Sequence, residues 1–361
     1  MNPGGGHYAG GGMRIVMTSF AFFPSIGGLE TTGLQLAEDF VGRGHEVVVV
    51  TRSPPDGPER SFPFIVLRRP DPRRLFQVIR TADIVFQNNI SLQLGWPALL
   101  LAKPMVVTHQ VWLGDAGSRF DARVAIKRLI LRRARCVAAS EALARQVGVP
   151  AEVILNPIDH GTFRVTNTGD RPLDLVFAGR LIRGKGVQVL LEALALLHGR
   201  GHGLTLTIAG TGADEAEFRA LADGLGLSDH VRFAGPLGPA ALADLFNQHK
   251  IVVVPSLWEE PFGMVTTEGM ACGCIAVVSD CGGLPEAVGP FGVRFRKGDP
   301  GALADGVVQA LAMVGSHRMT DALRLHLMRQ SRDHVTDRYL AVFADVLRGR
   351  AGPPRGRPMP S

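Results

Sequence analysis

The sequence contains no apolar run of the roughly 18 uninterrupted residues that a membrane-spanning helix needs. Residues 1–12 are rich in glycine and have neither a charged residue nor an apolar core, so no signal peptide is predicted. Residues 351–361 are rich in proline, glycine and arginine. We therefore expect a cytoplasmic protein in which residues 1–12 and 351–361 are disordered tails.

Cysteine is also scarce, and nothing in its spacing indicates a metal or redox site. There are four cysteines, of which Cys272 and Cys274 are separated by one residue, and this spacing is unusual for zinc or redox chemistry. We expect plain thiols in a reducing compartment. The acidic Asp-x-Asp motif that holds a divalent metal ion in some enzymes is absent as well, and no metal site is predicted.

The excess positive charge is confined to the first half of the chain. Residues 1–165 contain 19 basic and 13 acidic side chains, whereas residues 166–361 contain 20 of each. This asymmetry predicts an anionic partner for the N-terminal half, such as a phosphorylated acceptor or a membrane surface. Nucleic acid is not expected, because only 6% of residues are aromatic and most of these lie in apolar runs. An incidentally basic surface is the alternative.

The segment Arg119–Arg135 is the most basic part of the chain, with seven basic residues and one acidic residue, Asp121. On a helix, Val124, Ile130 and Leu131 would form an apolar side, and much of the rest would be cationic. Such a helix can lie among lipid headgroups, so the segment is a candidate for peripheral contact with the anionic inner face of a membrane. The alternative is that the apolar side packs on a sheet and the arginines are solvated.

Short apolar runs bounded by turn residues predict buried strands along the whole chain. They are Arg14–Thr18, Glu46–Thr51, Phe64–Leu67, Asp83–Phe86, Met105–Thr108, Arg135–Ala139, Glu152–Leu155, Asp174–Ala178, Leu204–Ala209, Val231–Phe233, Ile251–Val254 and Ile275–Val278. Helical spacing between them, clearest at Gly28–Arg43 and Val187–Leu197, predicts an α/β protein with parallel sheets. With 361 residues, two such domains are expected, joined by the polar stretch Arg164–Pro172.

Two cations lie in a glycine-bounded loop after the strand expected at Asp174–Ala178. Arg180 and Lys185 precede the helix that is expected to start at Val187. Arginine offers a planar fork to phosphate oxygens, lysine offers a compact charge, and the N–H groups of a helix start attract anions. The loop predicts phosphate binding, with a solvated basic turn as the alternative.

Two carboxylates lie eight residues apart after the strand expected at Ile251–Val254. Glu260 precedes a proline, which favours an extended turn, and Glu268 falls inside the following helix. The pair could bracket one ligand by accepting hydrogen bonds from sugar hydroxyls. Backbone N–H groups between them could meet a diphosphate, from Phe262, Gly263, Met264 and Val265. The alternative is a capping carboxylate and an ordinary helix-surface glutamate.

Two weaker signals lie in the N-terminal half. Gly27 and Gly28 follow the first expected strand and open the first helix, where glycines allow close approach to a ligand or simply form a tight turn. His109 follows the strand expected at Met105–Thr108, on the side where open parallel sheets bind ligands. The choice between a structural and a catalytic histidine stays open at this stage.

Taken together, these segments resemble glycosyltransferase family 4 over residues 13 to about 345. Further matching segments occur in the family's order: Ala138-Ala139-Ser140, Leu155-Asn156-Pro157-Ile158-Asp159 with Phe163, Ile208-Ala209-Gly210-Thr211-Gly212, Val231-Arg232-Phe233-Ala234-Gly235, Val254-Pro255-Ser256 and Gly282-Gly283-Leu284-Pro285-Glu286. The resemblance implies the GT-B fold, in which two Rossmann-like domains face each other across a central cleft. Residues 13–165 would bind the acceptor and residues 166–332 the nucleotide sugar. The helix within 333–350 would return to the N-terminal domain.

The resemblance also implies the site residues. Arg180 and Lys185 would hold the donor diphosphate, Glu260 the hydroxyls of the donor sugar and Glu268 those of the ribose. The remaining residues would act mainly through the backbone or near the sugar: Gly27, Gly28, Arg232, Phe233, Phe262, Gly263, Met264 and Val265 at the donor, and His109 beside the reacting sugar. The family often has aspartate after this histidine, whereas Gln110 follows His109 here.

The implied reaction is transfer of a sugar from a nucleotide-diphosphate sugar to an acceptor, with retention of anomeric configuration and without a metal ion. No separate cofactor is expected, and UDP or GDP is the expected nucleotide. The alternatives are an epimerase or phosphorylase of the same fold, or a non-catalytic protein that binds a sugar nucleotide. The acceptor is not predicted, because acceptor pockets vary with loops.

Overall fold

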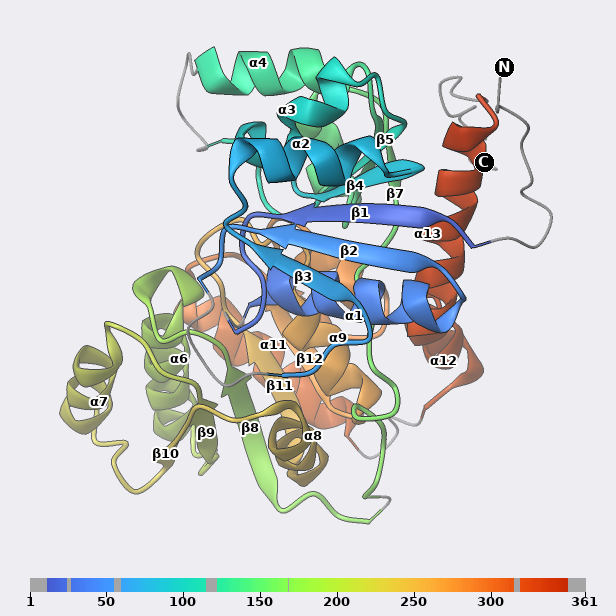
Figure 1. The fold of residues 1–361 in the computed structure, drawn as a ribbon. Helices are drawn as coiled ribbons and strands as arrows, with labels where there is room; N and C mark the ends of the chain where they lie inside the picture. Colours follow the sequence, from blue (N-terminus) through green and yellow to red (C-terminus); the bar gives the residue numbers. More distant parts are fainter. Residues whose placement is uncertain are drawn as a thin grey trace, which may run out of the picture. The chain divides into compact units, whose positions relative to one another are not determined.

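The computed structural model describes residues 12–24, 27–54, 60–114, 122–167, 169–314 and 319–349. The chain divides into two compact units (Figure 1). The first unit comprises the residues up to Pro157 together with those from Arg332 onward, and the second is Ile158–Ser331. The boundary lies earlier than the expected one after residue 165, because Ile158 and Phe163 are buried in the core of the second unit.

The first unit contains a seven-stranded parallel sheet in the order β3-β2-β1-β4-β5-β6-β7. The strands are β1 (Arg14–Ser19), β2 (Glu46–Thr51), β3 (Ile65–Arg68), β4 (Ile84–Asn88), β5 (Met105–His109), β6 (Arg135–Ala138) and β7 (Ala151–Val153). The helices are α1 (Gly28–Gly42), α2 (Pro72–Arg80), α3 (Leu92–Leu100), α4 (Ala122–Leu131), α5 (Glu141–Val147) and α13 (Arg332–Leu347). These strands confirm the apolar runs read from the sequence, with ends shifted by at most two residues.

Alternation along the strands of this sheet separates two apolar layers. In β1, Ile15 and Met17 face the layer that contains α1 and α13, whereas Val16 faces the layer that contains α2 and α3. Figure 1 shows α1 and α13 on one face of the sheet and α2, α3 and α4 on the other. Because both faces are covered, the strands read as continuous apolar runs.

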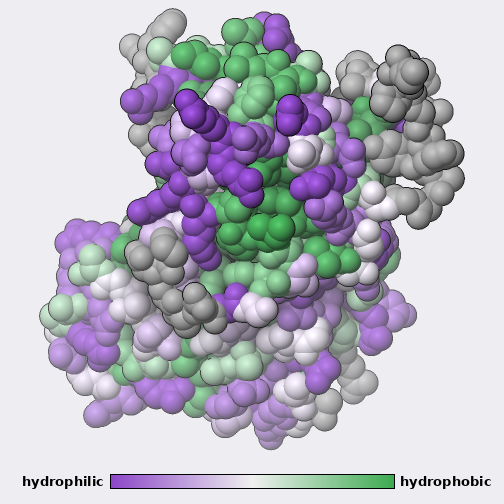
Figure 2. Space-filling model, viewed as in Figure 1, coloured by the Kyte–Doolittle hydropathy of each residue, from purple (hydrophilic) through white to green (hydrophobic). Residues whose placement is uncertain are grey.

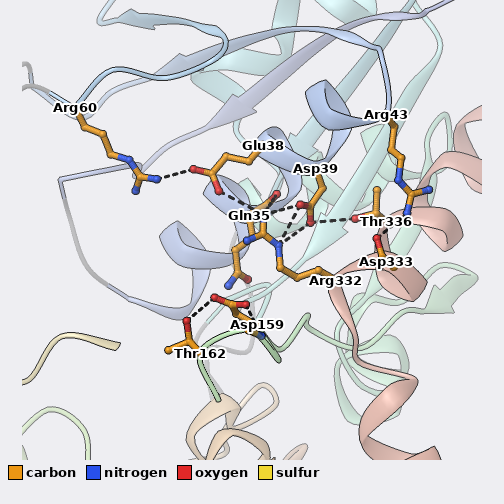
Figure 3. Close-up of polar contacts among 11 residues, drawn as sticks. Gln35, Glu38, Asp39, Arg43, Arg60, Asp159, Thr162, Arg332, Asp333 and Thr336 are labelled. Atoms are coloured by element: carbon orange, nitrogen blue, oxygen red, sulfur yellow. Dashed lines mark hydrogen bonds and ion pairs between the residues drawn. The ribbon is translucent and has the colours of Figure 1, made fainter. Parts of the chain in front are cut away.

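The last helix, α13, docks on α1 through charged contacts, which Figure 3 shows, and through aromatic contacts. Arg332 donates from Nη2 to Asp39 Oδ1 at 2.5 Å and from Nε to Asp39 Oδ2 at 3.0 Å. In addition, Phe343 packs against Phe40, with ring centroids 5.3 Å apart. The Tyr339 hydroxyl lies 2.7 Å from Thr108 Oγ1 at the end of β5. These contacts place residues 332–347 in the first unit.

The second unit contains a six-stranded parallel sheet in the order β10-β9-β8-β11-β12-β13. The strands are β8 (Leu173–Ala178), β9 (Leu206–Ala209), β10 (Val231–Gly235), β11 (His249–Val254), β12 (Ile275–Ser279) and β13 (Val293–Phe295). The helices are α6 (Val187–Gly199), α7 (Glu215–Gly224), α8 (Pro239–Gln248), α9 (Met264–Ala271), α10 (Leu284–Val288), α11 (Pro300–Met313) and α12 (Asp321–Met328). Only β13, three residues long, was not expected from the sequence.

Each sheet has a point at which successive helices change face. In the second unit, β8 and β11 are neighbours, but α6 after β8 packs in one apolar layer and α9 after β11 packs in the other. The loops that leave these two strands therefore diverge, and such divergence creates a ligand-binding crevice at the carboxyl edge of the sheet. In the first unit, β1 and β4 have the same relationship. Among the described residues, no helix combines the length and the apolar character needed to cross a bilayer.

Candidate functional site

The loops after β8 and β11 are joined at the point where they diverge. After β8 the chain passes through Arg180 and a short 3-10 turn, Arg183–Lys185, before α6 begins. The backbone N–H of Leu257, in the loop after β11, donates to the Gly184 carbonyl at 2.9 Å. This bond fixes the two loops together, so that Arg180 and Lys185 lie beside residues that are about 75 positions later in the chain.

Trp258 lies under both cations of this site. The Lys185 ammonium is 4.9 Å from the centroid of the indole ring, and the Arg180 guanidinium is 5.5 Å from it. Both distances are within the range of a cation–π interaction, in which the negative ring face attracts a positive charge. The indole therefore holds two like charges close together. The sequence analysis assigned no role to Trp258, although it lies within the motif that contains Glu260.

Glu260 completes the cluster, because its carboxylate contacts both Lys185 and Trp258. Its Oε1 accepts three hydrogen bonds, from Lys185 Nζ at 2.7 Å, Ser256 Oγ at 2.6 Å and Trp258 Nε1 at 2.7 Å. Only 6% of Glu260 is exposed, and no described residue donates to its Oε2. Lys185 and Glu260, which the resemblance assigns to different parts of a donor, thus form one ion pair. A buried ion pair with further hydrogen bonds is strongly oriented.

Glycines allow the loops to approach one another. Gly186 has φ of +76°, and a Cβ at this position would lie 1.8 Å from the Pro255 carbonyl oxygen. A Cβ on Gly210 would lie 1.9 Å from the Gly179 carbonyl oxygen. Both positions lie where one loop passes over another, and only glycine fits there. Gly210, which follows β9, therefore lets the chain pass close to the start of the cationic loop.

The start of α9 has the features expected of an anion-binding helix end. Gly263 precedes the helix with φ of +97° and, as a glycine, has no side chain of its own that could cap the helix. The neighbouring chain is held in place by the Gly283 N–H, which donates to the Glu260 carbonyl at 2.7 Å. Phe262 is buried, so it can serve a ligand only through its backbone. Met264 and Val265 form the first turn, where backbone N–H groups favour negative charge.

Glu268 lies farther along α9 and is chemically distinct from Glu260. Burial raises the pKa of the Glu268 carboxyl to about 7, while part of the side chain stays accessible. Within the part of the chain that the structure describes, no side chain pairs with this carboxyl by an ion pair or a hydrogen bond. The structure therefore shows two carboxylates with different states, one ion-paired and one unpaired with a raised pKa.

Arg232 and Phe233 lie on the edge strand β10, beside a surface hollow of about 360 Å³ that also includes Leu237 and Asp244. Arg232 is exposed, whereas the ring of Phe233 is covered by the Arg219 guanidinium, 4.2 Å from its centroid. The two side chains are therefore in different environments, and the Phe233 ring is already occupied by a cation.

The remaining expected residues belong to the first unit, at the carboxyl edge of its own sheet. Gly27 caps α1 with an extended backbone and no side-chain cap, and Gly28 begins the helix. Ile26, the residue before them, lies outside the described residues. His109 ends β5 and is 1% exposed, with Nε2 unpaired among the described residues. Burial, assisted by the charge of Lys127, lowers the pKa of His109 to about 4, so the imidazole is neutral at physiological pH.

Gln110, the residue after His109, is bonded within the first unit. The Gln110 N–H donates to Asn89 Oδ1 at 2.7 Å, and its side-chain Nε2 lies 3.4 Å from Thr108 Oγ1. The side chain of residue 110 is therefore part of the packing between β5 and α13.

Two family models match the chain in succession. The model described as Glycosyltransferase Family 4 matches residues 26–161, and the model described as Glycosyl transferases group 1 matches residues 162–321. A D-inositol 3-phosphate glycosyltransferase of Corynebacterium jeikeium (strain K411) is 34% identical over 203 residues, covering 52% of this chain and 46% of that protein. The D-inositol 3-phosphate glycosyltransferase of Arthrobacter sp. (strain FB24) is 40% identical over 118 residues, which cover 32% of this chain and 28% of that protein. The chain thus spans less than half the length of these relatives.

Solved structures show the same fold at low sequence identity. Anabaena HepE in complex with UDP has a TM-score of 0.79 and 20% identity, covering 92% of this chain and all of that one. Sucrose-phosphate synthase from Thermosynechococcus elongatus has a TM-score of 0.76 and 21% identity, and the match covers 93% of this chain and 100% of that one. The two parallel-sheet units therefore form a glycosyltransferase fold of the GT-B type, which confirms the expected fold class. Together with the matches along the sequence, this places the chain in glycosyltransferase family 4.

Proposed function

We propose that this protein transfers a sugar from a nucleotide-diphosphate sugar to an acceptor hydroxyl, with retention of anomeric configuration and without a metal ion. The observation that supports the proposal is the cluster of Arg180, Lys185, Trp258 and Glu260 at the switch point of the second unit. Two cations at the carboxyl edge of a parallel sheet, next to a helix start, suit a diphosphate group.

The cations supply the charge that the leaving nucleotide requires. When the bond between the anomeric carbon and the donor oxygen breaks, negative charge accumulates on the diphosphate. Lys185 is already oriented by Glu260 and Trp258, so it stabilises that charge without reorganisation at the moment of reaction. Arg180 adds a second, exposed donor of paired hydrogen bonds. This arrangement takes the place of a divalent cation in the proposed mechanism.

Retention follows in this proposal from attack on the same face that the nucleotide leaves. The acceptor oxygen forms the new bond to the anomeric carbon, and the acceptor proton goes to an oxygen of the departing phosphate. No side chain is required as a nucleophile, so Glu260 orients: its Oε1 holds Lys185, and its Oε2 accepts from a hydroxyl of the donor sugar. Glu268 accepts from the ribose hydroxyls.

UDP is the nucleotide that we propose first. Solved structures of Anabaena HepE contain UDP or UDP-glucose, and this chain has the same fold. The curated relatives are named for D-inositol 3-phosphate, which makes an anionic polyol the first acceptor to test against the basic first unit. The contributions of Gly27, Gly28 and His109, and the cytoplasmic location, stay predictions.

The test combines binding with product analysis. UDP should raise the melting temperature of the full chain, because a ligand of the folded state stabilises it, and GDP should raise it less. A panel of UDP-sugars with D-inositol 3-phosphate and related polyols should give an acceptor-dependent product in excess EDTA. NMR of the product should show the anomeric configuration of the donor. Acceptor-independent conversion of the donor, inversion, or a strict metal requirement would contradict the proposal.

A further inference from the structure

Helix α4 has apolar side chains on the face that normally carries polar ones. Ala122, Ala125, Ile126 and Leu129 follow each other at intervals of three, one and three residues, which places them on one side of a helix. All four are exposed, Ile126 by 50% and Leu129 by 64%. The inward face is as expected from the sequence: Leu131 is buried, and Val124 and Ile130 are half-buried against the core. The helix thus has two apolar faces, one of them turned outward.

Helix α3, which borders α4, also has an exposed apolar side chain. Leu100, at the end of α3, is 72% exposed. Between α3 and α4 lies an apolar cavity of about 250 Å³, whose walls include Leu92, Trp96, Ile126 and Ile130. Figure 2 shows hydrophobic side chains at the surface in the region of these helices, bordered by hydrophilic ones. A soluble surface rarely gathers several large exposed apolar residues around an apolar cavity without a binding role.

The charge of α4 and of the turn that follows it is of one sign. Residues 122–135 contain six basic residues and no acidic one. Arg128 lies on a flank of the outward apolar face, and Arg132 and Arg133 follow the end of the helix, all three exposed. Helix α2, which packs beside α3, adds exposed Arg73 and Arg74. Apolar side chains surrounded by arginines on a single face are the pattern of an interfacial amphipathic helix.

We propose that the outward face of α4 and the cavity beside it form a docking site for an anionic lipid bilayer. Ile126 and Leu129 enter the headgroup layer, the arginines meet lipid phosphates, and the cavity receives part of an acyl chain. A second copy of this chain does not suit the surface, because its identical basic residues would face each other. Nucleic acid does not suit it either, because the exposed leucine and isoleucine would have no apolar partner.

Vesicle binding by the full chain tests the site without any sugar donor, so its outcome is independent of the proposed transferase activity. The protein should sediment with vesicles of equal parts phosphatidylcholine and phosphatidylglycerol, and much less with pure phosphatidylcholine. Raising the salt to about 0.5 M should weaken the binding, because exposed charges are then screened over a few ångströms. No binding to the anionic vesicles at low ionic strength would overturn the proposal.

Two double variants distinguish the apolar contribution to vesicle binding from the ionic contribution. I126Q/L129Q should lower the partition coefficient at least about tenfold, since two exposed apolar side chains no longer enter the bilayer. R132Q/R133Q should lower it about thirtyfold, at roughly 1 kcal/mol for each charge, and reduce its salt dependence. The matched controls are L325Q/M328Q on α12, where Leu325 is 60% and Met328 49% exposed, and R200Q/R294Q. Unchanged binding by I126Q/L129Q, or equal losses in the controls, would overturn the site.

Quenching of tryptophan fluorescence by lipids with brominated acyl chains tests the cavity itself. Of the three tryptophans, Trp96 lines the cavity, Trp112 lies in the first unit but not in the cavity lining, and Trp258 lies in the second unit, so W112F, which should keep the quenching, is the matched control. Anionic vesicles with brominated chains should quench the wild-type protein, and W96F should lose most of that quenching while still sedimenting with the vesicles. Equal quenching of W96F and the wild type would overturn the placement of an acyl chain in the cavity.

Discussion

Lys185 Nζ and Glu260 Oε1 lie 2.7 Å apart, and the indole of Trp258 contacts both residues. The ion pair joins the two loops that diverge from β8 and β11. Its position makes Lys185 a fixed charge, whereas the exposed Arg180 is held mainly by the ring face. The two cations therefore differ in what their removal does to the protein.

Replacement of each cation by alanine should remove most transferase activity. Loss of one charge-assisted phosphate contact costs about 1.5–3 kcal/mol in binding, and more where the leaving charge develops. R180A should keep its melting temperature. K185A should melt lower, because Glu260 is then left buried with an unpaired charge, and K185A/E260Q should regain part of that stability without regaining activity. Turnover of either single variant within about threefold of the wild type would contradict the role.

The two carboxylates should affect different parts of the donor. E268A should weaken UDP and the UDP-sugar equally, because the ribose belongs to both ligands. E260Q should lower turnover more than UDP affinity, since it loosens Lys185 and removes an acceptor for the sugar. Calorimetry with UDP alone, beside steady-state rates, distinguishes the two. Equal losses of UDP affinity in both variants would refute the division.

The raised pKa of Glu268 predicts a loss of stability as the pH increases. The folded protein holds the proton up to a pH of about 7, whereas the unfolded chain releases it near 4.5. The folded state binds more protons in this window, so the free energy of unfolding falls from pH 4.5 to 7. The effect is about 2 kcal/mol after allowance for partial exposure. Burial of His109 also makes the stability depend on pH over an overlapping range. The quantity to measure is therefore the difference in the free energy of unfolding between the wild type and E268Q, obtained with denaturant across pH 5–8. A constant difference would contradict the prediction.

Gly186 and Gly201 form a matched pair for the close approach of the loops. Both have positive φ, +76° and +87°, but a Cβ on Gly186 would meet the Pro255 carbonyl oxygen at 1.8 Å, whereas a Cβ on Gly201 would meet nothing within 4 Å. G201A should therefore cost only the left-handed conformation, about 1–2 kcal/mol. G186A should cost at least about 2 kcal/mol more and should weaken UDP. Equal midpoints of chemical unfolding for the two variants would show that Gly186 does not lie close to the Pro255 carbonyl.

Local patterns in the sequence were sufficient for the elements and for the residue types of the site. Buried strands such as Glu46–Thr51 are apolar on both faces, and the helix at Val187 has regular apolar spacing, so each could be predicted from its own residues. The loop with Arg180 and Lys185 could be placed at a strand end for the same reason. These features depend on neighbours within a turn or a strand, and the order of residues encodes them directly.

Only the tertiary structure decided which of these residues meet. Lys185 and Glu260 are 75 positions apart, and their pairing depends on the adjacency of β8 and β11 in the sheet. The pKa of Glu268 depends on burial by residues outside α9, which helical spacing does not reveal. The outward face of α4 was misjudged as mainly cationic, because the sequence shows that Ile126 and Leu129 are apolar but not which side of the helix the core occupies. Contacts between distant segments require a definite arrangement of strands and helices, and that arrangement exists only in the folded chain.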